Sequence, residues 1–196
     1  MNKPMGYDDA TVGGFTPVEL GGHYCTIKQV NETKSSTGKD MIVVLFDFIA
    51  PDKQVGYFME QFKNDIREDK KWPFAGTKYI LVADYNDPNK TSSRFKSFIT
   101  CVEKSNNFSV QWGGDNWAAQ FKGKKIGAVY GEEEHEYDGK VSRRHLVRYF
   151  CSTDSVKDAK IPEAKLLTNV QTTATTNSDM SGFVSVPEGT EEELPF

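Results

Sequence analysis

The chain has 196 residues, enough for one domain with short appendages. Hydrophobic residues make up 37% of it and aromatic residues 12%, including 13 Phe, a composition that suits a compact domain rich in strands. No apolar run approaches the roughly 18 residues of a membrane-spanning helix, and the N-terminus has no signal-peptide core, so we expect a cytoplasmic protein.

The net charge of −4 is distributed unevenly along the chain. From Leu166 to the C-terminus there is no Lys or Arg, whereas five carboxylates lie in this stretch: Asp179, Glu188, Glu191, Glu192 and Glu193. The residues before Leu166 therefore carry one net positive charge. This asymmetry is typical of a nucleic-acid-binding domain that is followed by an acidic appendage.

Cysteine and histidine spacing argues against a metal or disulfide framework. The three cysteines are an odd number with long spacings, which favours reduced, buried thiols. The three histidines show no metal-ligand spacing either. We therefore predict no metal and no cofactor. The residues concerned are Cys25, Cys101, Cys151, His23, His135 and His145.

Hydrophobic patterning predicts three strands in the first third of the chain, after a loose lead-in over residues 1–20. Partial alternation predicts a strand over 22–31, and the Ser-, Thr- and Gly-rich stretch 33–39 predicts a turn. The β-branched and aromatic run MIVVLFDFI predicts a strand over 41–49. The segment VGYFMEQF predicts a third strand over 55–62, pairing back as a meander.

A helix and a hairpin follow. Phe95, Phe98, Ile99 and Val102 recur at helical spacing after a run of Thr and Ser that can cap the first turn, which predicts a helix over 91–104. The dipeptide Asp138-Gly139 is a strong hairpin-turn signal. It predicts antiparallel strands over 125–132 and 141–151.

Three strands, a helix and a hairpin predict a mainly β protein, most economically an OB-fold: a five-stranded Greek-key barrel with one capping helix. A five-stranded sandwich remains open at this point. We place the domain at 21–161, a flexible linker at 162–190 on its Thr-, Asn- and Ser-rich composition, and an acidic partner-binding tip at 191–196.

The last six residues, EEELPF, closely resemble the acidic tip of bacterial single-stranded DNA-binding proteins. The body is loosely similar, over about residues 7–155, to phage-encoded members of that class. The stretches that carry this similarity are GGHY at 21–24, STGKDMIVVLFDF at 36–48 and FKGKKIG at 121–127, which precedes the hairpin. The resemblance implies that Glu191, Glu192, Glu193, Leu194, Pro195 and Phe196 dock replication or recombination proteins.

A sequence-tolerant binder of single strands needs aromatic rings to stack on bases and cations to contact phosphates. Three segments combine such residues: the 34–39 loop, the predicted third strand with the segment after it, and the hairpin. Phe46, Phe48 and Phe58 are more typical of a core than of a stacking surface. The candidate DNA-binding residues are Lys34, Lys39, Tyr57, Phe62, Lys63, Lys70, Lys71, Trp72, Tyr137, Lys140, Arg144 and Arg148.

Strict alternation in the last strand places Arg144, Leu146, Arg148 and Phe150 on one face. The opposite face, with Val147 and Cys151, then turns inward, which leaves both arginines directed outward to contact phosphate. The acidic run 132–136 is interpreted as a solvated turn and not as a metal-nuclease site, because no second motif completes it.

The sequence therefore predicts a non-enzymatic protein that binds and protects single-stranded DNA in replication, recombination or repair. It would recruit a helicase, primase, polymerase or recombinase through its tip, in the host cytoplasm if it is phage-encoded. An adaptor that binds proteins and no DNA is the alternative, and a metal-dependent nuclease is a third. Homo-oligomerisation stays open.

Overall fold

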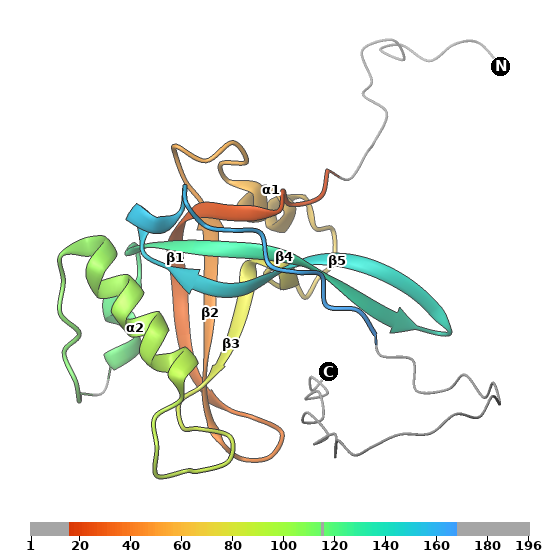
Figure 1. Cartoon of the computed structure of the whole chain (residues 1–196). Coiled ribbons are helices and arrows are strands. Elements are labelled where there is room, and N and C mark those ends of the chain that lie inside the picture. Colours follow the sequence, from red (N-terminus) through yellow and green to blue (C-terminus); the bar gives the residue numbers. More distant parts are fainter. Residues whose placement is uncertain (1–15, 115, 168–196) are drawn as a thin grey trace, which may run out of the picture.

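A computed structural model describes residues 16–114 and 116–167, and it shows a mainly β chain (Figure 1). All five strands form one antiparallel sheet in the order β3-β2-β1-β4-β5. Among the described residues, no helix is both long enough and apolar enough to cross a membrane. The strands are β1 (Gly21–Lys34), β2 (Asp40–Phe48), β3 (Thr77–Leu81), β4 (Lys125–Tyr137) and β5 (Lys140–Cys151), and the helices are α1 (Tyr57–Asn64) and α2 (Ser93–Asn106).

Four of the five predicted strands are confirmed, as are the helix and the hairpin turn. β1, β4 and β5 cover the spans predicted for them, β2 ends one residue before the predicted end, and α2 begins two residues after the predicted start. Asp138 and Gly139 have φ values of 52° and 69°, the left-handed conformation that a two-residue hairpin turn requires. Short-range signals therefore placed these elements correctly.

The strand predicted over 55–62 is wrong: this segment forms helix α1. Gly56 adopts φ 75° directly before the first residue of the helix. The buried carboxylate of Asp47 then accepts hydrogen bonds from the backbone N–H groups of Phe58 (3.0 Å) and Met59 (3.3 Å). A side chain on β2 thus satisfies N–H groups that a helix start leaves without partners. The third strand is instead β3, which pairs with β2 from Leu45↔Thr77 to Met41↔Leu81.

We expect Asp47→Ala to destabilise the protein by about 1–3 kcal/mol, because it removes the acceptor of buried N–H groups at the start of α1. Asp47→Asn keeps one acceptor oxygen and should cost less. Urea unfolding followed by circular dichroism measures both changes. An unfolding midpoint for Asp47→Ala equal to that of the wild type would show that the N–H groups find other partners.

The core lies between the curved sheet and α2 (Figure 1). The α2 residues Phe95, Phe98, Ile99 and Val102 are all buried, as the helical spacing predicts. Phe98 lies against Phe150 of β5, with ring centroids 5.6 Å apart. The prediction that Phe46, Phe48 and Phe58 are core residues is confirmed, since all three are fully buried. Of the thiols, Cys25 is buried as predicted, while Cys101 and Cys151 are only half-buried, and all three are free.

The two edges of the sheet, β3 and β5, meet through side chains. No backbone ladder joins them among the described residues, so the sheet is open at this seam. Lys78 of β3 reaches across and donates from Nζ to the carbonyl oxygen of Val147 on β5, at 2.8 Å. Tyr130 of β4 donates from its hydroxyl to the carbonyl of Ala75, just before β3. These contacts hold β3 beside β5.

The seam gives the stability a defined dependence on pH. Burial, helped by the positive charges of Arg94 and Arg148, lowers the pKa of Lys78 to about 8. Glu133 opposes this shift. Between that pKa and the ordinary lysine value, the unfolded chain binds more protons than the folded one, so the free energy of unfolding should rise with pH.

The full rise is on the order of 3 kcal/mol, at about 1.4 kcal/mol per pKa unit. Urea unfolding from pH 7.5 to pH 10, compared between wild type and Lys78→Met, isolates this contribution, because the other titrating groups are common to both proteins. The stability difference should shift in favour of the wild type as the pH rises. A stability difference that does not change with pH would contradict the lowered pKa of Lys78.

Contacts extend beyond both ends of the predicted domain 21–161. In the predicted lead-in, the carbonyl of Thr16 accepts from the Tyr57 hydroxyl, and Nε2 of Gln54 donates to the carbonyl of Pro17. At the other end, Lys165 forms a parallel bridge with Glu133, and its N–H donates to the Glu132 carbonyl. Most of the predicted linker 162–190, and the tip 191–196, lie outside the described residues.

Candidate nucleic-acid interface

The face of β1, β2 and β3 that points away from the core carries an aromatic side chain at the sheet edge. Tyr79 of β3 is 39% exposed and lies in register with Val43 of β2, which pairs with Asn31 of β1. Lys78 points the other way, into the seam, so alternation directs Tyr79 outward. The half-buried Leu81 is the next β3 residue on this outer face. A flat surface with an exposed ring is what base stacking requires.

The β1–β2 hairpin borders this face and supplies cations. Lys39 lies with Nζ 3.6 Å from the centre of the Tyr85 ring and donates to the Tyr85 carbonyl. Lys34 pairs with Asp40 at 2.7 Å, and both side chains are largely exposed. The predicted turn is tighter than expected: β1 continues to Lys34, and the N–H of Ser35 donates to the Lys39 carbonyl. Exposed Tyr85 extends the aromatic surface beyond β3.

The β4–β5 hairpin projects beyond the rest of the sheet (Figure 1). Tyr137 at its turn is 76% exposed, and Lys140 and Arg144 are exposed too. Neither cation forms an ion pair with the described residues. Arg143 is engaged differently: it pairs with Glu132 at 2.8 Å. The hairpin thus offers free cations beside an exposed ring.

Arg148 does not point outward beside Arg144, contrary to the sequence prediction. A β-bulge lies between Val129 and Tyr130 of β4, which pair with Tyr149 and Val147 of β5, so Arg148 is the extra residue. The bulge interrupts the alternation on which the prediction rested: Phe150 turns inward and is buried, while Tyr149 is exposed. Arg148 is half-buried and pairs with Glu133 at 3.3 Å. Arg144 and Arg148 therefore do not form one exposed pair.

The aromatic residues predicted around the supposed third strand lie against the core. Trp72 is half-buried, and its Nε1 donates to the carbonyl oxygens of Phe46 and Gly76. Phe62 contacts Trp72, with ring centroids 5.6 Å apart. The Tyr57 hydroxyl binds the lead-in, as described above. Lys63, Lys70 and Lys71 are exposed on α1 and on the segment that follows it.

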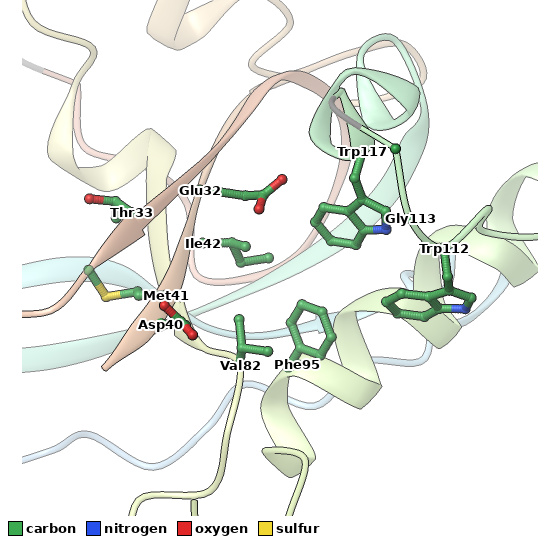
Figure 2. A pocket seen from close by; sticks show the side chains of 11 residues that line it. Glu32, Thr33, Asp40, Met41, Ile42, Val82, Phe95, Trp112, Gly113 and Trp117 are labelled. Atoms are coloured by element: carbon green, nitrogen blue, oxygen red, sulfur yellow. The ribbon is translucent and has the colours of Figure 1, made fainter. Parts of the chain in front are cut away.

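A pocket of about 350 Å³ lies on the other side of the β1–β2 hairpin, facing α2 (Figure 2). The rings of Trp112 and Trp117 are stacked, with centroids 5.7 Å apart and an interplanar angle of 23°. Phe95 contacts both tryptophans. Glu32 and Asp40 reach the pocket from the hairpin (Figure 2). Aromatic rings on one wall and carboxylates on the other suit a flat ligand that donates hydrogen bonds.

The described residues give little support for a metal site or for a nucleophilic thiol. No group of three His, Cys, Asp or Glu side chains there could hold a metal ion. In the acidic run, Glu132 and Glu133 are engaged by arginines. Burial raises the pKa of the Cys151 thiol to about 11, and burial also raises the pKa of Cys25. These thiols are therefore poor nucleophiles at neutral pH.

Sequence reasoning missed three exposed rings: Tyr79, Tyr85 and Trp112. The signal for Tyr79 was the short apolar run KYILV at 78–82, which could have been interpreted as a strand. Trp112 precedes Gly113 and Gly114, and a Trp next to two glycines signals an exposed loop. Tyr85 carried no comparable signal, because its contact with Lys39 depends on the tertiary fold.

Comparison of the chain with the models of known protein families finds no match. Comparison with curated proteins finds none either.

Proposed function

We propose that this protein binds single-stranded DNA on an OB-fold. The observation that carries the proposal is the outer face of β1, β2 and β3, where Tyr79 is exposed and lies in register with Val43 of β2, on a sheet whose two hairpins carry cations. In OB-folds, this face and the two hairpin loops beside it bind oligonucleotides. Stacking on tyrosine is tolerant of sequence, because every base has a flat face.

The strand order supports the OB-fold. In the order β3-β2-β1-β4-β5, β1 pairs with both β2 and β4, and α2 enters between β3 and β4. Closing β3 onto β5 would complete a five-stranded barrel, and the Lys78 contact to Val147 lies at that seam. The curved sheet with a helix packed against it thus fits the barrel architecture, with its remaining gap bridged by a side chain.

The tip and the body have separate roles in this proposal. Glu191 to Phe196 resembles the partner-docking tip of bacterial single-stranded DNA-binding proteins, and the body resembles phage-encoded members of that class. The body coats and protects the strand. The tip inserts Phe196 into a pocket of a replication or recombination protein, where its glutamates meet basic residues. This activity belongs in the cytoplasm, where such partners act.

The proposal is tested by a gel shift with labelled oligo-dT against a duplex of equal length. The single strand should bind more tightly, and its affinity should fall with salt by a slope of about −0.7 per phosphate contact. Equal affinity for both substrates would contradict a preference for single strands. Absence of binding to either would favour the adaptor, because a protein that binds only proteins needs no DNA surface.

We expect removal of residues 191–196 to leave oligo-dT affinity unchanged, or slightly higher at low salt. The reason is that the acidic tip competes weakly with DNA for the basic side chains of the body. The same deletion should abolish recruitment of the replication partner. Phe196→Ala should reduce partner recruitment nearly as much, because the Phe196 ring is the largest apolar group of the tip. Parallel titrations with oligo-dT and with replication proteins measure both. If the truncated protein lost DNA affinity and kept partner binding, the tip would bind DNA and the body would bind the partner, contrary to this proposal.

A further inference from the structure

The pocket beside the β1–β2 hairpin has a mixed chemistry that ordinary core packing does not explain. Trp112 is 66% exposed although its ring stacks on Trp117, so a large apolar surface faces solvent. Gly113 and Gly114 follow it with φ values of 85° and 89°, and the space around both is open. An exposed aromatic surface at the mouth of a pocket marks a binding site.

A second observation points to a ligand. The Nε1 of Trp117 is buried, and it has no hydrogen-bond partner among the described residues. Figure 2 shows this nitrogen on the side of the ring that faces the segment from Trp112 to Gly113. A buried N–H without an acceptor carries a desolvation cost, so its presence in a binding site requires an explanation. An acceptor on a bound molecule would supply its missing partner.

The opposite wall carries the carboxylates of Glu32 and Asp40, with Thr33 beside them. Glu32 has no ion-pair partner among the described residues, and Asp40 is bound by Lys34 at 2.7 Å. Glu32 pairs with Ile42 across the hairpin, which places its side chain on the same side of the sheet as the core and therefore toward α2. The ligand must then combine a flat ring, N–H donors for the carboxylate and an acceptor for the indole N–H.

We propose that this pocket receives a single base of the bound strand and prefers guanine. The inference rests on the proposed function and deepens it, because it adds a base-specific contact on the other side of the β1–β2 hairpin from the sequence-tolerant outer face, so the strand must pass around this hairpin. The Watson–Crick edge of guanine carries the N1–H and N2–H donors that a carboxylate can accept together, and O6 and N7 are acceptors. The base stacks on Trp112, while its donors face Glu32.

The other candidate occupants fit less well. Thymine has one N–H donor and so cannot engage both oxygens of a carboxylate. A lysine or arginine side chain would satisfy the aromatic rings and Glu32, but it brings no acceptor for the Trp117 N–H. At about 350 Å³ the pocket is at the small end of ligand sites, which suits one nucleoside better than a folded peptide.

The test compares an oligo-dT of fixed length with the same oligomer carrying one central guanine, and with one carrying inosine, which lacks the N2 amino group. Binding is followed by tryptophan fluorescence at fixed salt. The guanine oligomer should bind at least about fivefold more tightly than oligo-dT, the lower end of the discrimination that a paired contact provides. Inosine should lose most of that gain.

Two variants test whether the guanine preference comes from this pocket. Glu32→Gln should reduce the guanine preference to near unity while oligo-dT affinity stays the same, and Trp112→Ala should remove both the preference and most of the fluorescence quenching. Glu60→Gln, an exposed carboxylate on α1, is the matched control and should keep the preference. Circular dichroism confirms folding of each variant.

Equal binding of the guanine and thymine oligomers by the wild type would overturn the inference and leave the proposed function standing. The proposed function fails separately, if neither oligomer binds. Free guanosine gives an independent reading of the pocket: it should quench the fluorescence in the wild type and not in Trp112→Ala. Quenching by an arginine peptide in place of guanosine would assign the pocket to a protein partner and overturn the inference.

Discussion

Tyr79→Ala should weaken binding to oligo-dT by about 10-fold to 100-fold, the effect of removing one ring that stacks on a base. The ring is exposed and contributes little to the core, so the fold should be retained. Because stacking does not depend on base identity, the loss should be similar for oligo-dT and oligo-dC. Fluorescence anisotropy at fixed salt measures the change.

Tyr149→Ala provides the matched control, since Tyr149 is similarly exposed but lies on β5, away from the face of β1, β2 and β3. Its affinity for oligo-dT should match the wild type. The salt dependence should stay the same in Tyr79→Ala, because the phosphate contacts come from Lys and Arg. Equal losses for the two tyrosines would move the binding surface away from β3.

Gly22→Ala should destabilise the folded state by about 3 kcal/mol or more, because a Cβ at this position has no room. The new atom would lie 2.2 Å from the carbonyl oxygen of Val156 and 3.2 Å from Cβ of Ala159. The nearest atom belongs to the backbone, so rotation of a side chain cannot relieve the clash. The segment after β5 would have to move off β1.

Thermal unfolding followed by circular dichroism measures this loss. Gln29→Ala is the control for an alanine in β1, since Gln29 is exposed on the same strand, and it should cost well under 1 kcal/mol. If Gly22→Ala melts at the wild-type temperature, the segment around Val156 does not pack on β1 as described.

The elements that sequence reasoning placed correctly are those with a local signal. The Asp138-Gly139 turn sets its own conformation, and the α2 pattern repeats over several turns. The prediction for segment 55–62 failed because its structure depends on Asp47, which lies 11 residues before Phe58 and on another element. Neither alternation nor composition indicates such a long-range cap.

The residues of the candidate site also separate into those with a local sequence signal and those whose position depends on the tertiary fold. Tyr137, Lys140 and Arg144 were identified because a hairpin exposes what lies near its turn. Trp72 was misjudged because the acceptors of its indole N–H, the carbonyls of Phe46 and Gly76, come together only in the fold. The position of Arg148 depends on a bulge, and one extra residue reverses which side chains face the core.

The seam between β3 and β5 also affects how copies of the protein behave beside one another. An open sheet leaves two strand edges whose backbone groups could pair with another chain and begin aggregation. Here β3 is only five residues long, and β5 is interrupted by the bulge at Arg148. Lys78, an inward-pointing charge on an edge strand, occupies the seam beside β3 and so opposes the addition of a second strand there. The lysine that joins the two edges thus also protects them from pairing with another chain.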